Sequence, residues 1–216
     1  MAKIIAIANH KGGVAKTTSC VNIAAALAKM GRRVLLVDVD PQANLTSSFT
    51  DESKIEASIY DAMKGAPAPI MNISENLDLI PSHIDLAGAD MVFSNKIARE
   101  QILKNILDEL KAGYDYIIID TPPALGLVTI NALTAADSVI ISICAETLPL
   151  RGLVMLDEMI GDIAQSINKG LHVSGIIIAK YNRRKLDNAV IEAIREKYGD
   201  KIYKTYVRTC VSAAEA

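Results

Sequence analysis

Long apolar runs recur along the chain without alternating polar residues. Such runs are typical of parallel strands that helices cover on both faces, whereas strands with one face in water alternate. The runs predict strands at 3–8, 33–37, 77–81, 116–120, 138–143 and 172–179, with a last edge strand at 202–207.

Between these runs, apolar residues recur with the three- and four-residue spacing of amphipathic helices. The predicted helices span 16–29, 44–51, 55–63, 85–93, 96–110, 151–167 and 187–198. The core stripe of the fifth helix comprises Ile97, Ile102, Leu103, Ile106, Leu107 and Leu110. Alternating strands and helices predict a three-layer, doubly wound α/β fold with a mostly parallel sheet. Because no linker or repeat divides the chain, we expect a single domain over residues 1–216.

The composition agrees with this fold and indicates the cellular compartment in which we expect the protein. Half of the 216 residues are hydrophobic and 4% are aromatic, which suits an aliphatic core around a parallel sheet. The cysteines Cys20, Cys144 and Cys210 are far apart and form no C-x-x-C pair, so we expect a reducing cytoplasm rather than disulfides or a zinc site. The first apolar run is too short for a signal peptide, and no run approaches the ~18 residues of a membrane span.

The net charge of −2 hides an uneven distribution. Residues 169–208 hold ten Lys or Arg against four Asp or Glu, while the rest of the chain is acidic. A basic segment of this kind is compatible with a polyanion-binding face and equally with a solvated helix face rich in lysine. Charge alone leaves both interpretations open.

Residues 9–18 carry the strongest chemical signal. They lie between an apolar strand and a predicted helix and read Asn-His-Lys-Gly-Gly-Val-Ala-Lys-Thr-Thr. The backbone N–H groups of such a loop, the helix N-terminus and the charge of Lys16 make a phosphate cradle, and Thr17 would add a hydroxyl for Mg²⁺. The expected phosphate-binding residues are Lys11, Gly12, Gly13, Val14, Ala15, Lys16, Thr17 and Thr18.

Carboxylates follow two of the predicted strands. Asp38 and Asp40 come after the run 33–37, and Asp120 ends the run 116–120. The carboxyl ends of parallel strands meet at the edge where such sheets bind ligands, so we expect these side chains beside the phosphate loop. A buried carboxylate is costly unless a cation satisfies it, which predicts that Asp120 faces Mg²⁺.

The loop departs from the ordinary G-x-x-x-x-G-K-[ST] pattern, because His10 and Ala15 occupy the glycine positions and Lys11 adds a second lysine. This KGGxxK[ST] form resembles the deviant Walker A loop of the ParA/MinD family of P-loop ATPases, and most closely that of the ParA-type, Soj-like partitioning ATPases. Residues 38–44 and 115–123 resemble the second motif and the Walker B motif of that family. The motifs occur in the family order and cover the chain to about residue 125.

The resemblance implies an ATPase that binds ATP or ADP with Mg²⁺ and forms an ATP-dependent homodimer. It implies that Lys11 reaches the nucleotide of the other subunit and that Asp40 orients the attacking water, while Lys16 bridges the β- and γ-phosphates. The implied metal-binding residues are Thr17, Asp38 and Asp120, and the implied adenine contact is Asn182.

The resemblance also implies partners. Proteins of the ParA type bind duplex DNA without sequence preference and act with a centromere-binding, ParB-like protein to partition a plasmid, an integrated element or a chromosome. The implied setting is the cytoplasm of a bacterium, at the nucleoid and without membrane contact. The implied DNA contacts are Arg183, Arg184, Lys185, Lys204 and Arg208.

Two features depart from the family pattern: Ala15 replaces the usual glycine, and we expect residues 1–216 to lack the final helix with which relatives usually continue. A MinD-like positioning ATPase would need a basic amphipathic C-terminal helix, and a nitrogenase-iron-protein-like electron donor would need paired cluster cysteines; the sequence has neither. A ParA-like regulatory ATPase and a nucleotide-gated binding module with little hydrolysis share the motifs and stay open as alternatives.

Overall fold

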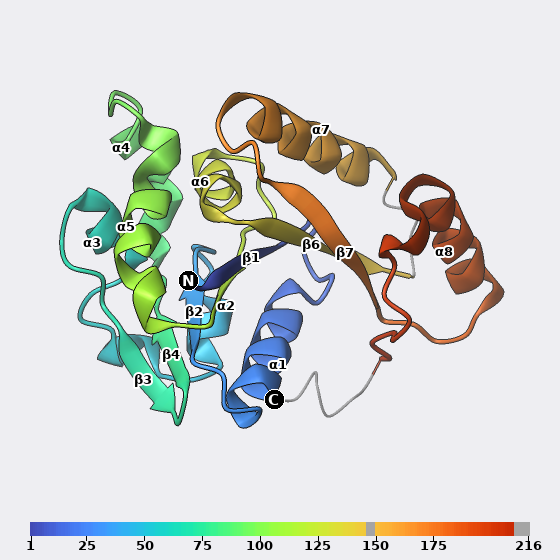
Figure 1. Cartoon of the computed structure of the whole chain (residues 1–216), viewed down its shortest axis with the longest axis horizontal. Coiled ribbons are helices and arrows are strands. Elements are labelled where there is room, and N and C mark those ends of the chain that lie inside the picture. Colours follow the sequence, from blue (N-terminus) through green and yellow to red (C-terminus); the bar gives the residue numbers. More distant parts are fainter. Residues whose placement is uncertain (146–149, 210–216) are drawn as a thin grey trace.

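The computed structural model describes residues 1–145 and 150–209, which form layers of helices around a twisted sheet (Figure 1). Within these residues the sheet has seven strands in the order β3-β4-β2-β5-β1-β6-β7, and the pairing of the edge strand β3 with β4 is antiparallel whereas the others are parallel. The predicted mostly parallel α/β fold is therefore confirmed. The strands are β1 (Lys3–Ala8), β2 (Val34–Asp38), β3 (Met71–Ser74), β4 (Leu77–Ile80), β5 (Tyr116–Asp120), β6 (Ser138–Cys144) and β7 (His172–Ala179).

Helices cover both faces of this sheet. One face is packed against α1 and α2, and the other against a larger group that includes α5, α6 and α7. Within the described ranges the α-helices are α1 (Lys16–Lys29), α2 (Asn44–Ser47), α3 (Ile59–Lys64), α4 (Ala89–Val92), α5 (Ile102–Leu110), α6 (Leu127–Ala135), α7 (Leu150–Ser166) and α8 (Lys185–Tyr198).

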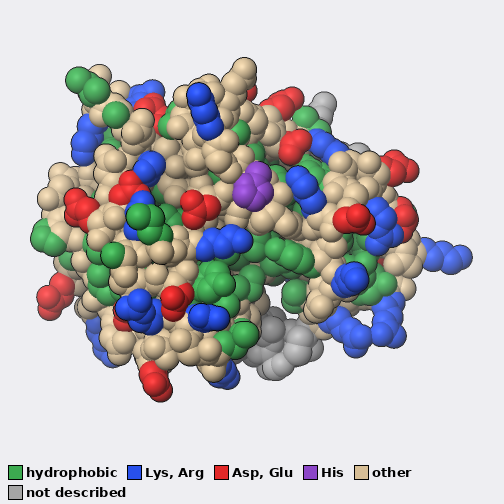
Figure 2. Space-filling model, in the orientation of Figure 1, with side chains coloured by type: hydrophobic (Ala, Val, Ile, Leu, Met, Phe, Trp, Pro, Cys, Tyr) green, Lys and Arg blue, Asp and Glu red, His purple; other side chains and the backbone are tan. Residues whose placement is uncertain are grey.

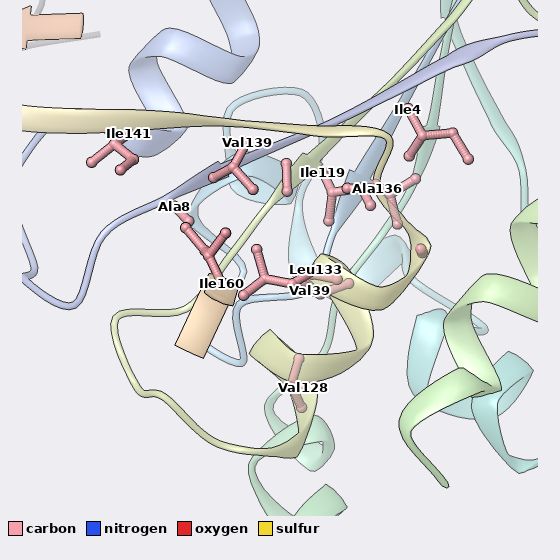
Figure 3. Close-up of a cluster of buried hydrophobic side chains, with 14 of the residues drawn as sticks. Ile4, Ala8, Val39, Ile119, Val128, Leu133, Ala136, Val139, Ile141 and Ile160 are labelled. Carbon is pink, nitrogen blue, oxygen red and sulfur yellow. The ribbon is translucent and has the colours of Figure 1, made fainter. Parts of the chain in front are cut away.

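The main core lies between the sheet and the helices α6 and α7, where Leu133 and Ile160 meet side chains of the central strands (Figure 3). Ile117 and Ile119 of β5 face this core, whereas Ile118 between them faces a smaller core beneath α1. Both faces of the strand are thus dry, which explains why the apolar runs show no alternation.

Strand order decides where the predicted motifs meet. β5 lies between β2 and β1, so the segments that follow these three strands emerge side by side at one edge of the sheet. The register places Asp120 beside Asp38 on one side and beside Ile7, just before the phosphate loop, on the other.

Two elements were missed by the sequence analysis. In α6 almost every residue is buried, so the apolar positions have no helical period that would reveal the helix. The strand β3 is a four-residue edge strand with two exposed positions, and its pattern is too short to distinguish from a turn.

The edge strand predicted at 202–207 is wrong. The N–H groups of Tyr203 and Val207 donate to the carbonyls of Ile176 and Ile178, at 3.0 and 2.8 Å. Four residues of this segment therefore span only two residues of β7, and the excess length prevents a regular ladder. What forms instead is a pair of isolated bridges, one at each end.

Helix boundaries differ from the predictions at a few positions. The helix predicted at 96–110 begins only at Ile102, because Ala98 adopts a left-handed conformation (φ 55°) that interrupts the turn; Ile97, expected in the core, is 94% exposed. The helix predicted at 55–63 begins at Ile59, after Ser58 and Asp61 form a capping box. Cys210 and the expected absence of a final helix lie outside the described residues.

Candidate functional site

The loop between β1 and α1 turns sharply at two positions. Gly13 and Ala15 have φ values of 70° and 63°, both in the left-handed region. The α1 helix begins directly afterwards, and Ser19 donates from its N–H and its hydroxyl to the Ala15 carbonyl, at 3.0 and 2.7 Å. The loop therefore wraps around the N-terminus of α1, where backbone N–H groups and the helix dipole favour an anion.

The neighbouring strand β6 holds this loop in place. The Asn9 amide donates to the Ser142 carbonyl at 2.5 Å, while its oxygen accepts the N–H of Lys11 at 2.9 Å. The Ser142 hydroxyl donates to the Val14 carbonyl at 2.5 Å. Asn9 and Ser142 are both buried, and neither was identified from the sequence, because no local motif marks a contact across 133 positions.

The side chain of Lys16 folds back into the loop that precedes this residue in the sequence. Its side chain is 7% exposed, and its ammonium donates to the Lys11 carbonyl at 3.2 Å, which curls the loop around the charge. Burial lowers the pKa of Lys16, while the nearby carboxylates of Asp120 and Asp40 favour its charged form. Lys11 itself is exposed.

Asp120 is the most enclosed carboxylate at the loop. It is 1% exposed, and its Oδ2 accepts the Thr17 hydroxyl at 2.6 Å. Its Oδ1 is buried and accepts no hydrogen bond from the described residues. Burial raises the pKa of Asp120 to about 7; the hydrogen bond from Thr17 opposes this rise and the charge of Asp38 adds to it.

Asp38 and Asp40 shape the turn that follows β2. Asp38 is fully buried and accepts three hydrogen bonds, from the Asp40 N–H at 3.0 Å and from the N–H and hydroxyl of Thr46 at 2.9 and 2.7 Å. Burial raises the pKa of Asp38 to about 6, against these hydrogen bonds. The Asp40 carboxylate accepts the Gln42 N–H at 3.0 Å and lies close enough to Lys16 to favour its charge. Protein donors thus already engage both oxygens of Asp38.

The segment after Asp120 is tied to the phosphate loop at two points. The Thr121 hydroxyl donates to the Ile7 carbonyl at 2.9 Å, and the His10 Nδ1 lies 3.0 Å from the Pro123 carbonyl. His10 also packs against α7, where a Cβ on Gly152 would come within 3.4 Å of its ring. Among the described residues His10 belongs to no cluster of metal-binding side chains, and its contacts join three segments of the site.

The basic residues predicted to contact DNA gather near α8, where Lys and Arg side chains cluster at one end of the molecule (Figure 2). Buried Asp187 accepts the N–H groups of Asn182 and Arg184, at 2.7 and 3.1 Å, and so shapes the loop before α8. The Tyr181 N–H donates to the Val207 carbonyl at 3.1 Å, which brings 204–208 beside 181–185. All five predicted DNA contacts are exposed, namely Arg183, Arg184, Lys185, Lys204 and Arg208.

Asn182, predicted to contact adenine, lies in the loop after the carboxyl end of β7. It is half-buried, and its amide donates to the Lys180 carbonyl at 3.2 Å. Because β7 adjoins β6 and β6 adjoins β1, Asn182 lies at the same edge of the sheet as the phosphate loop, two strands away.

The residues present fit a nucleotide with a divalent cation. The unpartnered Oδ1 of Asp120, and the two carboxylates of Asp120 and Asp40 beside the single charge of Lys16, leave negative charge that a cation would balance. Across residues 1–145 and 150–209, no three His, Cys, Asp or Glu side chains converge into a metal site of their own. Thr17 and Asp120 would supply part of the shell of a cation here, and water and phosphate oxygens of a bound nucleotide would supply the rest, as is usual for Mg²⁺.

No helix in the described part of the chain is long and apolar enough to cross a membrane.

Comparisons with known proteins agree with the geometry. A family model described as an AAA domain matches residues 2–173. The chain is 44% identical over 223 residues to the sporulation initiation inhibitor protein Soj of Bacillus subtilis, covering all of this chain and 88% of Soj. It is 35% identical over 223 residues to the chromosome partitioning protein ParA of Caulobacter vibrioides, covering 99% of this chain and 83% of that protein.

Solved structures are similar over most of the chain. A structure of cobyrinic acid a,c-diamide synthase from Mycobacterium smegmatis with bound ADP and magnesium superposes with a TM-score of 0.88 at 40% identity, covering 92% of this chain and 83% of that one. A putative plasmid partition protein from Borrelia burgdorferi bound to AMPPNP superposes with a TM-score of 0.84 at 31% identity, covering 100% and 90% of the two chains.

Proposed function

This chain belongs to the ParA/Soj family of P-loop ATPases, and we propose that its site binds ATP with Mg²⁺ and hydrolyses the ATP to ADP and phosphate. The observation that carries the proposal is the junction of Thr17 with Asp120 beside the buried Lys16. This junction joins the phosphate loop to the end of β5 and leaves one buried carboxylate oxygen for a cation's water shell. The nucleotide- and magnesium-bound forms of the structural neighbours support the same ligands.

Each side chain has a role in this proposal. Lys16 would neutralise the charge that develops between the β- and γ-phosphates, and loop N–H groups from Gly12 to Thr18 would hold the phosphate oxygens. Thr17 and Asp120 would hold Mg²⁺, which supplies Lewis-acid polarisation of the phosphoryl oxygens when bound. Asp40 would orient the attacking water, and Asp38 would keep Asp40 in place through its hydrogen bond.

We also propose that ATP joins two copies of the chain into a homodimer. Lys11 is exposed, and in the dimer it would reach a phosphate held by the other subunit. A γ-phosphate neutralised partly in trans stabilises the dimer, and hydrolysis removes that charge. Nucleotide state would thus set the oligomeric state.

The dimer would bind duplex DNA through the basic residues around α8. The observation that supports this is the hydrogen-bonded junction of 181–185 with 204–208, which collects charges from two separate segments on one exposed surface. Contacts of this kind are made to the phosphates of the DNA backbone and do not depend on the base sequence. With a ParB-like partner at the nucleoid in the cytoplasm, the cycle would partition a plasmid, an integrated element or a chromosome.

The test is ATP hydrolysis by the purified chain with Mg²⁺, with and without nonspecific duplex DNA. We expect turnover that DNA stimulates, and a loss of at least about 100-fold in Lys16→Ala because a charge at the transferring phosphoryl group is removed. Lys29→Ala, at the exposed end of the same helix, is the matched control and should keep full activity.

DNA binding is measured in parallel with an ATP analogue at several salt concentrations. Replacing Arg183 and Arg184 by alanine should weaken binding and reduce its dependence on salt. Replacing the exposed pair Arg32 and Arg33 at the opposite edge of the sheet removes the same charge and should have little effect.

The outcomes separate the alternatives. No ATP turnover under any condition would favour the nucleotide-gated binding module. Binding to DNA that ignores both nucleotide and the arginine changes would favour a regulatory ATPase over partition. Turnover that depends on cobyrinic acid instead of DNA would favour the activity named for the M. smegmatis neighbour.

A further inference from the structure

The turn that carries Asp40 is too short to hold its own shape. After Asp40 the chain passes through Ala43, which is left-handed (φ 50°), into α2, a helix of four residues without a side-chain hydrogen bond at its N-cap. A helix of this length is not stable by itself, and a left-handed alanine adds strain. Leu45 anchors the apolar side of α2, because it is fully buried in the core beneath α1. The polar side needs an anchor of its own.

Thr46 is the polar anchor of α2. It is 1% exposed, and both its N–H and its hydroxyl donate to the Oδ2 of Asp38, at 2.9 and 2.7 Å. The Thr46 hydroxyl oxygen also accepts the N–H of Ser82 at 2.9 Å. A backbone N–H can only donate, so the Thr46 oxygen is the acceptor in that bond and its own proton is directed at Asp38. The hydroxyl is thus oriented from both sides.

Ser82 connects this network to the neighbouring strand of the sheet. β4 pairs in parallel with β2, with Ile80 opposite Val37, so Ser82 and Asp38 leave their strands at the same edge. Ser82 and Asp38 are both fully buried. The Thr46 hydroxyl therefore joins the carboxyl ends of two adjacent strands, in an interior where hydrogen bonds are strong and an unmade one is costly.

The network continues to the backbone of Asp40. The second oxygen of Asp38, Oδ1, accepts the Asp40 N–H at 3.0 Å, which forms an Asx turn. The Asp40 carboxylate then accepts the Gln42 N–H at 3.0 Å, so a second turn of the same kind is built on the first. A rotation of the Asp38 carboxylate would move the backbone from which the Asp40 side chain leaves. A misplacement of about 1 Å in an active site can cost about 100-fold in rate, so the orientation of Asp38 matters for catalysis.

We propose that Thr46 is a positioning residue for ATP hydrolysis, which acts through Asp38 to set the place of the Asp40 carboxylate. Thr46 does not itself touch the nucleotide in this proposal, because its hydroxyl proton is committed to Asp38. The inference rests on the proposed function for the role of Asp40 in orienting the attacking water. It adds the hydroxyl of α2 and its anchor at the end of β4 to the parts that the reaction requires.

Three substitutions of buried threonines test the proposal. Thr46→Val removes the hydroxyl at nearly the same shape, and Thr46→Ser keeps the hydroxyl and lacks only the methyl group. The matched control is Thr134→Val in α6. Thr134 is also 1% exposed, its hydroxyl has no hydrogen-bond partner among the described residues, and it lies just before β6 begins, at the edge of the sheet opposite the phosphate loop.

ATP hydrolysis with Mg²⁺ and the affinity for a fluorescent ADP are measured for each variant. We expect Thr46→Val to lower kcat by about tenfold or more and to change ADP affinity by less than about twofold, because ADP has no γ-phosphate for a water to attack. Thr46→Ser and Thr134→Val should keep kcat within about twofold of the unaltered chain. In a chain that already carries Asp40→Ala, adding Thr46→Val should change the residual rate by less than about twofold, since the residue on which it acts is gone.

Amide hydrogen exchange of the nucleotide-free protein tests the same network without turnover. Thr46→Val removes the acceptor of the Ser82 N–H and loosens Asp38, so the amides of Ser82 and Asp40 should exchange at least about tenfold faster. The amide of Leu36, in the middle of β2, is the internal reference and should not change. Thr134→Val should leave all three amides as they are.

The results separate this proposal from that of the ATPase. An unchanged kcat in Thr46→Val, or an equal loss of kcat and of ADP affinity, would overturn the positioning role, and so would a full further loss in the Asp40→Ala chain. If the unaltered chain hydrolyses no ATP, the ATPase proposal fails, and the exchange of the Asp40 amide then decides alone. Faster exchange in Thr46→Val would still support the placement of Asp40 by Thr46, and unchanged exchange would overturn it.

Discussion

Ala15 occupies a backbone conformation that usually belongs to glycine. Its φ of 63° lies in the left-handed region, where the Cβ of an L-residue crowds the following carbonyl. Ala15→Gly should raise the free energy of unfolding by about 1 kcal/mol, since the relief of this strain exceeds the added flexibility of glycine in the unfolded chain. Urea unfolding of the nucleotide-free protein measures the effect.

The matched control is Ala26→Gly, an exposed position inside the same helix with ordinary helical geometry. There the change should lower stability by about 1 kcal/mol, so the two identical substitutions should act with opposite signs. Destabilisation at both positions would mean that the loop does not strain Ala15.

The phosphate loop and its carboxylates could be predicted because their signals are local. Lys16 and Thr17 lie in one short motif, and Asp120 ends an unmistakable apolar run. The residues that hold the loop in shape could not be found in this way. Asn9 and Ser142 are ordinary polar residues whose importance arises only when β1 and β6 become neighbours.

At the scale of elements, α6 depends on a cap that comes from α4. The Leu127 N–H donates to the Asp90 carboxylate at 3.0 Å, and a Cβ on Gly126 would come within 2.9 Å of the other carboxylate oxygen. Gly126 has a φ of −98°, so alanine would fit the backbone and clash only with Asp90. We expect Gly126→Ala to cost about 1 kcal/mol through loss of this cap, measured by urea unfolding.

A double-mutant cycle isolates the contact. In a chain that already carries Asp90→Ala, adding Gly126→Ala should cost almost nothing, because the carboxylate is gone. Gly88→Ala, at another helix start with open space around it, should be close to neutral in either background. If Gly126→Ala destabilised the Asp90→Ala chain as much as the unaltered chain, Gly126 would be required for a reason other than its contact with Asp90.

A helix could be predicted where one of its faces is buried and the other exposed, and a strand could also be predicted where both of its faces are buried. β5 and α5 have such patterns, whereas α6 is enclosed on all sides and loses the contrast that marks a helix. The prediction of a strand at 202–207 failed for a different reason. Its residues suit a strand, but the mismatch of its length with β7 is a tertiary property.

For the whole molecule, two buried carboxyls give stability an unusual pH dependence. Burial raises the pKa of Asp120 to about 7 and that of Asp38 to about 6, whereas both titrate near 4 in an unfolded chain. Between about pH 4 and pH 7 the folded protein therefore holds protons that the unfolded chain has released. Stability should fall as the pH rises through this window, in EDTA and without nucleotide.

Asp120→Asn tests the source of this dependence. Asparagine cannot ionise but can still accept the Thr17 hydroxyl, so the variant should unfold at a higher urea concentration than the unaltered protein at pH 8. The difference should close at pH 5, where Asp120 is protonated in the folded state. Parallel pH profiles for the two proteins would contradict the assignment.

The clamp of the phosphate loop by Asn9 and Ser142 also has a consequence for biosynthesis. The loop leaves the ribosome within the first twenty residues, but the strand that holds it follows more than a hundred residues later. A nascent chain shorter than about 142 residues contains every loop residue and lacks the partner that shapes them. The capacity to hold a nucleotide is therefore acquired late in translation, although its sequence is among the first to be made.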